Sequence, residues 1–133
     1  MKTTNVLMVI LLSILFVTCK SNPTTSDNST NNGIVGKWLW TQTSGGIAGT
    51  TTKPSANQLV VIQFTADSSY YSFSHDTLKR STSYSIKKGS TRDTLMWKDM
   101  PNYKQVISYL TQDSLSIDDT GADGFGSTYT RVH

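Results

Sequence analysis

The sequence predicts an all-β domain, an eight-stranded antiparallel up-and-down barrel, placed after a signal peptide and a flexible tether. Three observations support this fold class. Short runs rich in Val, Ile, Thr and aromatic residues recur from residue 34 onward, turn-forming residues separate them, and no segment has a convincing helical periodicity. The chain has 133 residues. Without the leader, about a hundred residues remain, which is enough for one modest domain.

Residues 1–18 have the features of a secretion signal. Lys2 supplies a positive charge near the start, and residues 6–17 are apolar apart from Ser13. This run is too short to cross a bilayer as a mature helix. It is followed by Cys19, the single cysteine of the chain, so an internal disulfide is excluded.

The stretch Phe16-Val17-Thr18-Cys19 resembles the bacterial lipoprotein signal, in the looser form of the Bacteroidetes group. It departs from the strictest pattern because Leu15 lies one place early and Thr18 replaces a Gly or Ala. The resemblance implies that Cys19 receives a diacylglyceryl group, that the leader is removed, and that the new amino terminus is acylated, for example with palmitate. Several acyl chains, at about 0.8 kcal/mol per buried CH₂, would hold a protein on a membrane. An ordinary secretion signal with an incidental cysteine is the alternative.

The next segment is small and polar. Residues 20–32 read "KSNPTTSDNSTNN" and have no apolar periodicity, which is typical of a flexible tether. We therefore divide the chain into a signal peptide (1–18), a lipidated cysteine with its tether (19–33) and a barrel domain (34–133). In such bacteria the signal for export to the cell surface looks like a cluster of acidic residues just after the cysteine. Here Asp27 is the only acid near Cys19, so the cluster is missing. We expect an anchor in the outer membrane with the domain on the periplasmic face.

Eight short runs then read as strands. Turn signals lie between most of them, and short connections favour antiparallel neighbours joined as hairpins. Closure into a barrel removes the exposed edges of an open sheet. Residues 44–57, "SGGIAGTTTKPSAN", are expected to form a flap or to pair partly with their neighbours. The predicted strands are 34–43, 58–65, 70–74, 82–87, 94–97, 103–111, 114–117 and 127–132.

Alternation along the predicted strands assigns aromatic side chains to the interior. Two interpretations stay open: these side chains fill the barrel as its core, or they line a site for one small ligand. A buried tyrosine hydroxyl needs a partner, which favours an apolar ligand with a few polar groups. Leu59 and Val61 make the second run apolar on its other face as well, so we expect something to cover it. The candidate ligand-lining residues are Trp40, Phe64, Tyr71, Phe73, Tyr84, Trp97, Tyr109 and Tyr129.

Both ends of the predicted barrel resemble the lipocalins. "GIVGKWLW" carries the Gly-x-Trp signature as Gly36 and Trp38, and "TYTRVH" places Arg131 in the last strand. The resemblance implies that Gly36, Trp38 and Arg131 form the barrel floor, where a guanidinium over an indole ring contributes about 0.5 to 2 kcal/mol. Residues 111–114, Thr-Gln-Asp-Ser, stand where the family has Thr-Asp-Tyr, and the usual helix after the barrel has no room.

Other chemistries find little support in the sequence. Twelve Lys and Arg face nine Asp, for a net charge of +3, and the basic residues are scattered, so we expect no nucleic-acid partner. The cysteine and the two histidines are too few for a Cys/His metal site. We assign the pair His75-Asp76 to a hairpin turn, because no nucleophile motif accompanies it. We also expect Lys79 and Arg80 to form part of a solvated rim.

The Asp-rich segment 118–126, "DDTGADGFG", superficially resembles a calcium loop. Its spacing is not that of an EF-hand, no Glu is present to close the site, and Asp with Gly is ordinary turn chemistry. Whether Asp118, Asp119 and Asp123 bind calcium stays open, and we predict no other metal, no cofactor and no enzymatic activity.

The sequence thus supports two functional hypotheses for a monomeric, membrane-anchored barrel. The first is a binding module for a small, largely apolar ligand. The alternative is a protein-interaction module, either an inhibitor of an envelope enzyme or an accessory subunit of an envelope complex, acting through residues 44–57 on a filled barrel. An interior cavity of about a few hundred Å³ would favour the first hypothesis.

Overall fold

The computed structural model describes residues 33–133. The predicted signal peptide, the lipidation of Cys19 and residues 20–32 of the tether lie outside the described residues. The regular secondary structure of these residues consists of strands alone. Residues 33–133 therefore contain no helix that could cross a membrane. The strands are β1 (Gly36–Gly45), β2 (Thr50–Thr52), β3 (Val60–Phe64), β4 (Ser69–Ser74), β5 (Thr77–Lys87), β6 (Asp93–Trp97), β7 (Lys104–Leu110), β8 (Ser114–Asp119) and β9 (Phe125–Val132).

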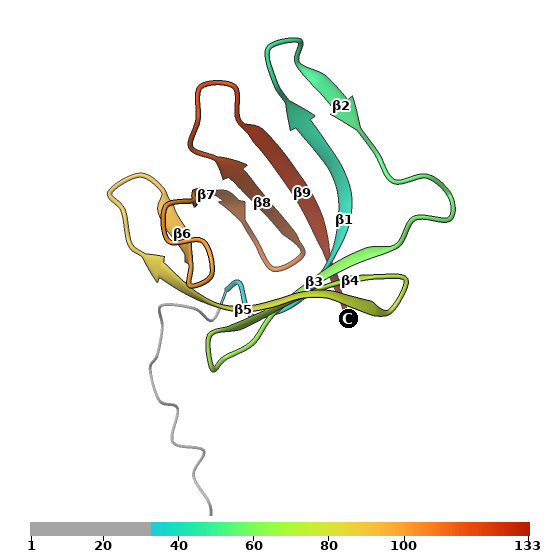
Figure 1. The fold of residues 1–133 in the computed structure, drawn as a ribbon, viewed down its shortest axis with the longest axis horizontal. Helices are drawn as coiled ribbons and strands as arrows, with labels where there is room; N and C mark the ends of the chain where they lie inside the picture. The colour runs from blue at the N-terminus through green and yellow to red at the C-terminus, as the bar shows by residue number, and fades with distance from the viewer. Residues whose placement is uncertain (1–32) are drawn as a thin grey trace, which may run out of the picture.

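The strands form one antiparallel sheet in the order β2-β1-β3-β4-β5-β6-β7-β8-β9 (Figure 1). β1 also pairs with β9 along most of its length, from Lys37 opposite Val132 to Gly45 opposite Phe125, so the sheet closes on itself. The predicted fold class is therefore confirmed: β1 and β3 to β9 make an eight-stranded antiparallel barrel. The short strand β2 is an addition to it.

The alternating strand directions place successive connections at opposite ends of the barrel. One end, the closed end, carries residues 33–35, the connections 65–68, 88–92 and 111–113, and the C-terminus. The other end, the open end, carries the connections 46–49, 53–59, 75–76, 98–103 and 120–124. In Figure 1 the β1–β2 hairpin projects at the top of the view, far from the C-terminus.

Two differences from the predicted strands exceed the one or two residues by which most strand ends differ. Residues 50–52 pair with the end of β1, so the segment 44–57 partly pairs with its neighbour and is not a free flap. β5 starts at Thr77, five residues before the predicted start at residue 82. It starts there because Thr77 and Leu78 continue the ladder with β4 up to a tight turn, in which His75 and Asp76 have positive φ angles of 49° and 60°.

The core fills the barrel between its two ends. The partners Trp38, Ile62 and Arg131 share one inward-facing row across β3, β1 and β9. Apolar burial of this kind is the main favourable term in folding. The buried core residues are Ile34, Trp38, Ile62, Phe64, Tyr70, Tyr84, Leu95, Trp97, Ile107, Leu115 and Ile117.

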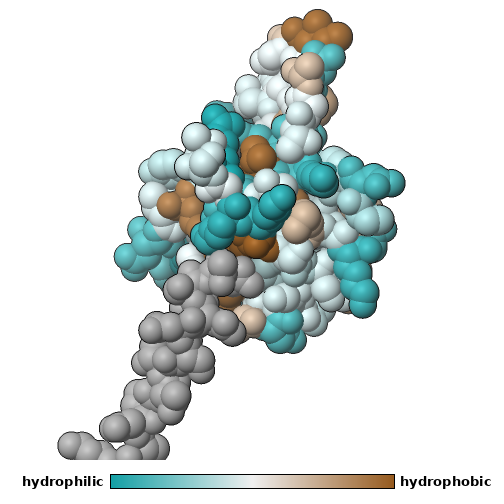
Figure 2. Space-filling view, turned by 90° about the vertical axis from the view of Figure 1, so that its left-hand side faces the viewer, coloured by the Kyte–Doolittle hydropathy of each residue, from teal (hydrophilic) through white to brown (hydrophobic). Residues whose placement is uncertain are grey.

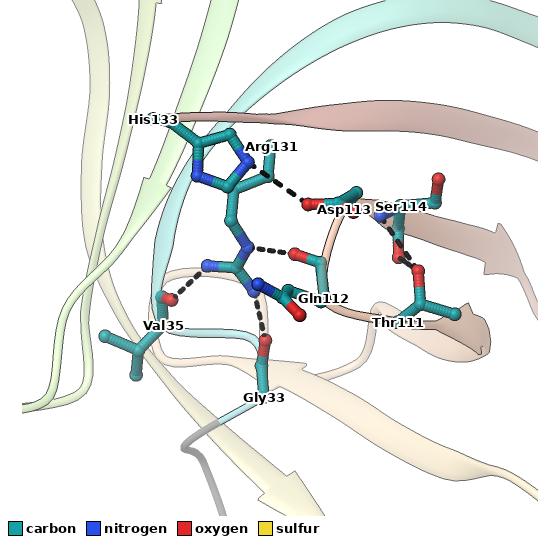
Figure 3. Close-up of polar contacts among 8 residues, drawn as sticks. All are labelled: Gly33, Val35, Thr111, Gln112, Asp113, Ser114, Arg131 and His133. Atoms are coloured by element: carbon teal, nitrogen blue, oxygen red, sulfur yellow. Dashed lines mark hydrogen bonds and ion pairs between the residues drawn. The ribbon is translucent and has the colours of Figure 1, made fainter.

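The closed end is plugged by Trp38 and Arg131 (Figure 3 draws the contacts of Arg131). Trp38 is 0% exposed, and its Nε1 donates to the Ile34 carbonyl at 2.7 Å. The Arg131 guanidinium lies 4.0 Å from the centre of the Trp38 ring. Its Nη1 donates to the Val35 carbonyl at 2.8 Å, its Nη2 to the Gly33 carbonyl at 2.7 Å, and its Nε to the Gln112 carbonyl. All three guanidinium nitrogens are thus bonded to the main chain.

Gly36 completes this arrangement. Its φ of 142° lies in the region that favours glycine, and a Cβ at this position would lie 2.4 Å from Arg131 Nη1. A larger residue would therefore push the guanidinium off its carbonyl acceptors. The three predicted floor residues, Gly36, Trp38 and Arg131, lie together at the closed end.

A candidate binding cavity at the open end

A cavity of about 400 Å³ lies inside the barrel on the side of the open end. Its walls come from β3 to β9 and from the connection between β6 and β7. Four aromatic rings line it, and polar groups from three tyrosines, one arginine and one glutamine share the surface with them. The lining residues are Ile62, Tyr70, Arg80, Trp97, Met100, Tyr103, Gln105, Ile117 and Tyr129.

Trp97 is the central aromatic residue of this cavity. Its ring meets Tyr70 edge to face, with 4.6 Å between the ring centres, and stacks on Phe64 at 6.3 Å. Its Nε1 donates to Gln105 Oε1 at 3.2 Å, which satisfies the one polar atom of the ring. The indole is thus held in one orientation from both sides.

Arg80 is the one Lys or Arg among the lining residues. It faces inward on β5 opposite Ser72, and its guanidinium lies 4.7 Å from the centre of the Trp97 ring and 5.5 Å from that of Tyr70. Nε and Nη2 donate to the two oxygens of Asp99 at 3.0 and 2.8 Å. These bonds raise the pKa of Arg80 and hold the pKa of Asp99 at about 2.

Asp119 is the centre of a second polar cluster at the cavity rim. Its Oδ1 accepts from the Tyr103 hydroxyl and from Gln105 Nε2 at 2.9 Å, and its Oδ2 from the Phe125 amide at 3.3 Å. Burial raises the pKa of Asp119, but these bonds outweigh it and lower the value. Burial and the contact with Asp119 raise the pKa of Tyr103 to about 12. This cluster therefore uses its hydrogen-bonding groups internally.

Two further tyrosines present hydroxyl groups to the cavity. Burial raises the pKa of both Tyr70 and Tyr129, while the neighbouring hydroxyls of Ser72 and Ser127 act in the opposite direction. Both tyrosines are therefore neutral at ordinary pH and able to donate a hydrogen bond. They lie on β4 and β9, on different sides of the barrel.

The eight predicted lining residues fall into three groups. Trp97 and Tyr129 line the cavity. Phe64 and Tyr84 belong to the buried core below it, and the Tyr84 hydroxyl donates to the Thr65 carbonyl at 3.0 Å. Trp40 is half-buried on β1 opposite Tyr129, and its Nε1 donates to Thr43 Oγ1 at 2.9 Å.

The remaining three, Tyr71, Phe73 and Tyr109, lie on the outer face, so their predicted place in the interior was wrong. On β4 the buried residue is Tyr70, and side chains alternate along a strand, so Tyr71 and Phe73 point outward. On β7 the pairing with β8 shifts between Ile107 and Tyr109. This bulge reverses the alternation and leaves Tyr109 57% exposed.

The predicted list of lining residues lacks seven of the nine, among them the two core isoleucines Ile62 and Ile117. Arg80 was assigned to a solvated rim, and this expectation is corrected, since its guanidinium lies over two interior rings. Met100 and Tyr103 lie in or beside a predicted turn, and Gln105 is a polar residue on a strand. Tyr70 is the one residue that the sequence could have revealed. It alternates with Tyr71 and Phe73, and the set of Tyr70, Ser72 and Ser74, all with hydroxyl groups, is the one that faces inward.

Two hollows lie on the outer face of the barrel. One, of about 410 Å³, is apolar and is lined by Leu39, Val61 and Phe73 with Leu59, Val132, Lys37 and Asp76. The sequence predicts a cover over this face, but residues 33–133 leave the hollow open. The other, of about 440 Å³, is polar and includes Asp118 and Asp119. Among the described residues no three His, Cys, Asp or Glu side chains are placed to hold a metal ion.

Comparisons of the chain with protein-family models, with curated proteins and with solved structures gave no match.

Proposed function

We propose that this protein is a membrane-anchored lipoprotein whose lipocalin-like barrel binds a small, largely apolar ligand at its open end. The observation that carries the proposal is the interior cavity of about 400 Å³ lined by Tyr70, Trp97, Tyr103 and Tyr129. A packed barrel would have filled this space with its own side chains. In this proposal the acylated Cys19 anchors the protein, and the barrel lies on the periplasmic face of the outer membrane. Both parts are supported by the sequence. The protein acts by binding, with no chemical step.

The test is native mass spectrometry of the mature full chain, purified in detergent from its own cell envelope. We expect a stoichiometric small molecule that leaves on extraction with organic solvent. Met100 lines the cavity, so Met100→Trp should fill it and abolish the bound mass. Met96 pairs with Ser85 on the outer face of the same region, so Met96→Trp is the matched control and should keep the ligand. A wild-type protein without any bound mass would contradict the proposal.

A second candidate function, docking of an envelope protein, is favoured by one specific feature. Ile47, at the tip of the β1–β2 hairpin, is 91% exposed. Figure 2 shows a hydrophobic group at the end of this projection. An apolar tip held away from the barrel suits a protein partner better than a small ligand. Cross-linking in intact envelopes would identify a stoichiometric partner that Ile47→Asp removes, whereas an unchanged cross-linking pattern would eliminate this candidate.

A further inference from the structure

The polar groups of the cavity differ in how much hydrogen-bonding capacity they have left. Tyr103, Gln105 and the Trp97 Nε1 are bonded to one another or to Asp119. The unused groups are those of Tyr70, Tyr129 and Arg80, and all three can donate. The cavity therefore keeps unused hydrogen-bond donors on three of its strands, β4, β5 and β9.

Arg80 has the strongest unused donor. A guanidinium has five N–H groups in a planar fork and binds a carboxylate through two parallel hydrogen bonds. Asp99 takes the edge formed by Nε and Nη2. Nη1 has no hydrogen-bond partner among residues 33–133, so the edge formed by Nη1 and Nη2 is free for a second acceptor. Asp99 and the two aromatic rings hold the guanidinium in place, which lowers the entropic cost of using that edge.

We infer that the cavity selects an amphipathic monocarboxylate, whose carboxylate binds the Nη1 edge of Arg80 while its apolar body lies against Trp97 and Met100. This inference rests on the proposed function and adds the chemical class of the ligand. The hydroxyls of Tyr70 and Tyr129 would donate to the same carboxylate or to a second oxygen of the ligand. Asp99 already offsets the charge of Arg80, so the gain over a neutral ligand is about tenfold in affinity, the value of one charge-assisted hydrogen bond.

The probes for this inference are 2-naphthoate and its uncharged isostere 2-naphthamide. Both present the same flat apolar body, which the cavity volume accommodates. Isothermal titration calorimetry uses the mature full chain, cleared of bound molecules and held in lipid nanodiscs, with empty nanodiscs as the blank. We expect 2-naphthoate to bind about tenfold more tightly than 2-naphthamide, and added salt to weaken 2-naphthoate alone.

Two variants locate the selectivity. Arg80→Gln should remove the preference for 2-naphthoate and leave the affinity for 2-naphthamide nearly unchanged. Lys79→Gln is the matched control, because it removes one positive charge from the adjacent residue of β5, which is exposed and not part of the cavity lining. It should keep the full preference. Should Arg80→Gln fail to fold, Arg80→Lys replaces it: lysine keeps the charge but lacks the planar fork, so the preference should fall.

The two proposals fail in different ways. Equal binding of both probes in the wild-type protein overturns the carboxylate selectivity and leaves the binding cavity in place. A preference for 2-naphthoate that survives in Arg80→Gln also overturns it, since another group would be responsible. Binding of neither probe overturns the selectivity, and together with a native mass free of ligand it contradicts the proposed function as well.

Discussion

The barrel holds two arginine–tryptophan pairs, one toward each end, and they are bonded in different ways. At the closed end Arg131 lies 4.0 Å from the Trp38 ring centre and gives its three nitrogens to three main-chain carbonyls. At the open end Arg80 lies 4.7 Å from the Trp97 ring centre and gives two nitrogens to one carboxylate, that of Asp99. The stacking is similar, but the acceptors are not.

This difference separates an arginine whose three nitrogens are all bonded to the main chain from one that keeps a free edge, which is the edge that we propose binds a ligand. Carbonyls of residues 33, 35 and 112 come from three parts of the chain, so Arg131 ties the N-terminal residues, the β7–β8 turn and β9 together. Asp99 belongs to a single connection and leaves one edge of Arg80 free. A cation over an indole ring is therefore insufficient to tell the two pairs apart, whereas the acceptors of the guanidinium distinguish them.

The largest expected effect is at the closed end. Trp38→Ala removes a fully buried indole and the hydrogen bond to the Ile34 carbonyl, so we expect a loss of about 3 to 5 kcal/mol in the free energy of unfolding. Urea unfolding followed by circular dichroism measures it. Trp40→Ala is the control, because Trp40 is only half-buried, and should cost clearly less. A loss below about 1 kcal/mol for Trp38→Ala would remove its role as the plug.

The second prediction compares the two arginines directly. Arg131→Met keeps the apolar stem but leaves three carbonyls without their donor, so we expect a loss of about 1.5 to 3 kcal/mol. Arg80→Met should cost clearly less, because its ion pair with Asp99 is partly exposed and screened by solvent. Parallel urea titrations of the two variants give both values. Equal losses would show that both arginines are structural.

The third prediction uses pH to sharpen the contrast. Carbonyl acceptors do not titrate, but Asp99 has its pKa lowered from 3.8 to about 2, chiefly by the hydrogen bonds from Arg80. A lowered folded-state pKa gives stability that is present above 3.8 and is lost as pH falls through 2. Asp99→Asn should therefore flatten the acid limb of a stability profile between these values. A profile identical to that of the wild-type protein would mean that Arg80 does not hold this carboxylate in solution.

The smallest expected effect concerns the outer face. Because the bulge on β7 turns Tyr109 outward, Tyr109→Ser should change the free energy of unfolding by no more than about 0.5 kcal/mol. Chemical unfolding measures the difference. The same substitution at Tyr84, a buried core residue of the barrel, should be strongly destabilising. A comparable loss at Tyr109 would place its ring inside and contradict the bulge.

The sequence was sufficient for the fold class because alternation and turn residues act over a few neighbouring positions. Trp97 and Tyr129 were assigned to the interior for this reason, and both line the cavity. Alternation failed where a strand contains an extra residue, as between Ile107 and Tyr109. It also failed for Arg80, because a charged residue in a pattern of polar and apolar positions is predicted to face the solvent. The partner that makes its burial possible, Asp99, lies 19 residues away and is brought near only by the folded barrel.

The two ends of the barrel also define a direction. Gly33, where the described chain begins, lies at the closed end and is bonded there to Arg131, while the cavity opens at the opposite end. With the proposed anchor at Cys19, the chain would reach the barrel from the side of its floor, opposite the mouth of the cavity. A bound molecule would then enter and leave at the end of the barrel that is free of this attachment, so ligand exchange would not require the floor contacts of Arg131 to open.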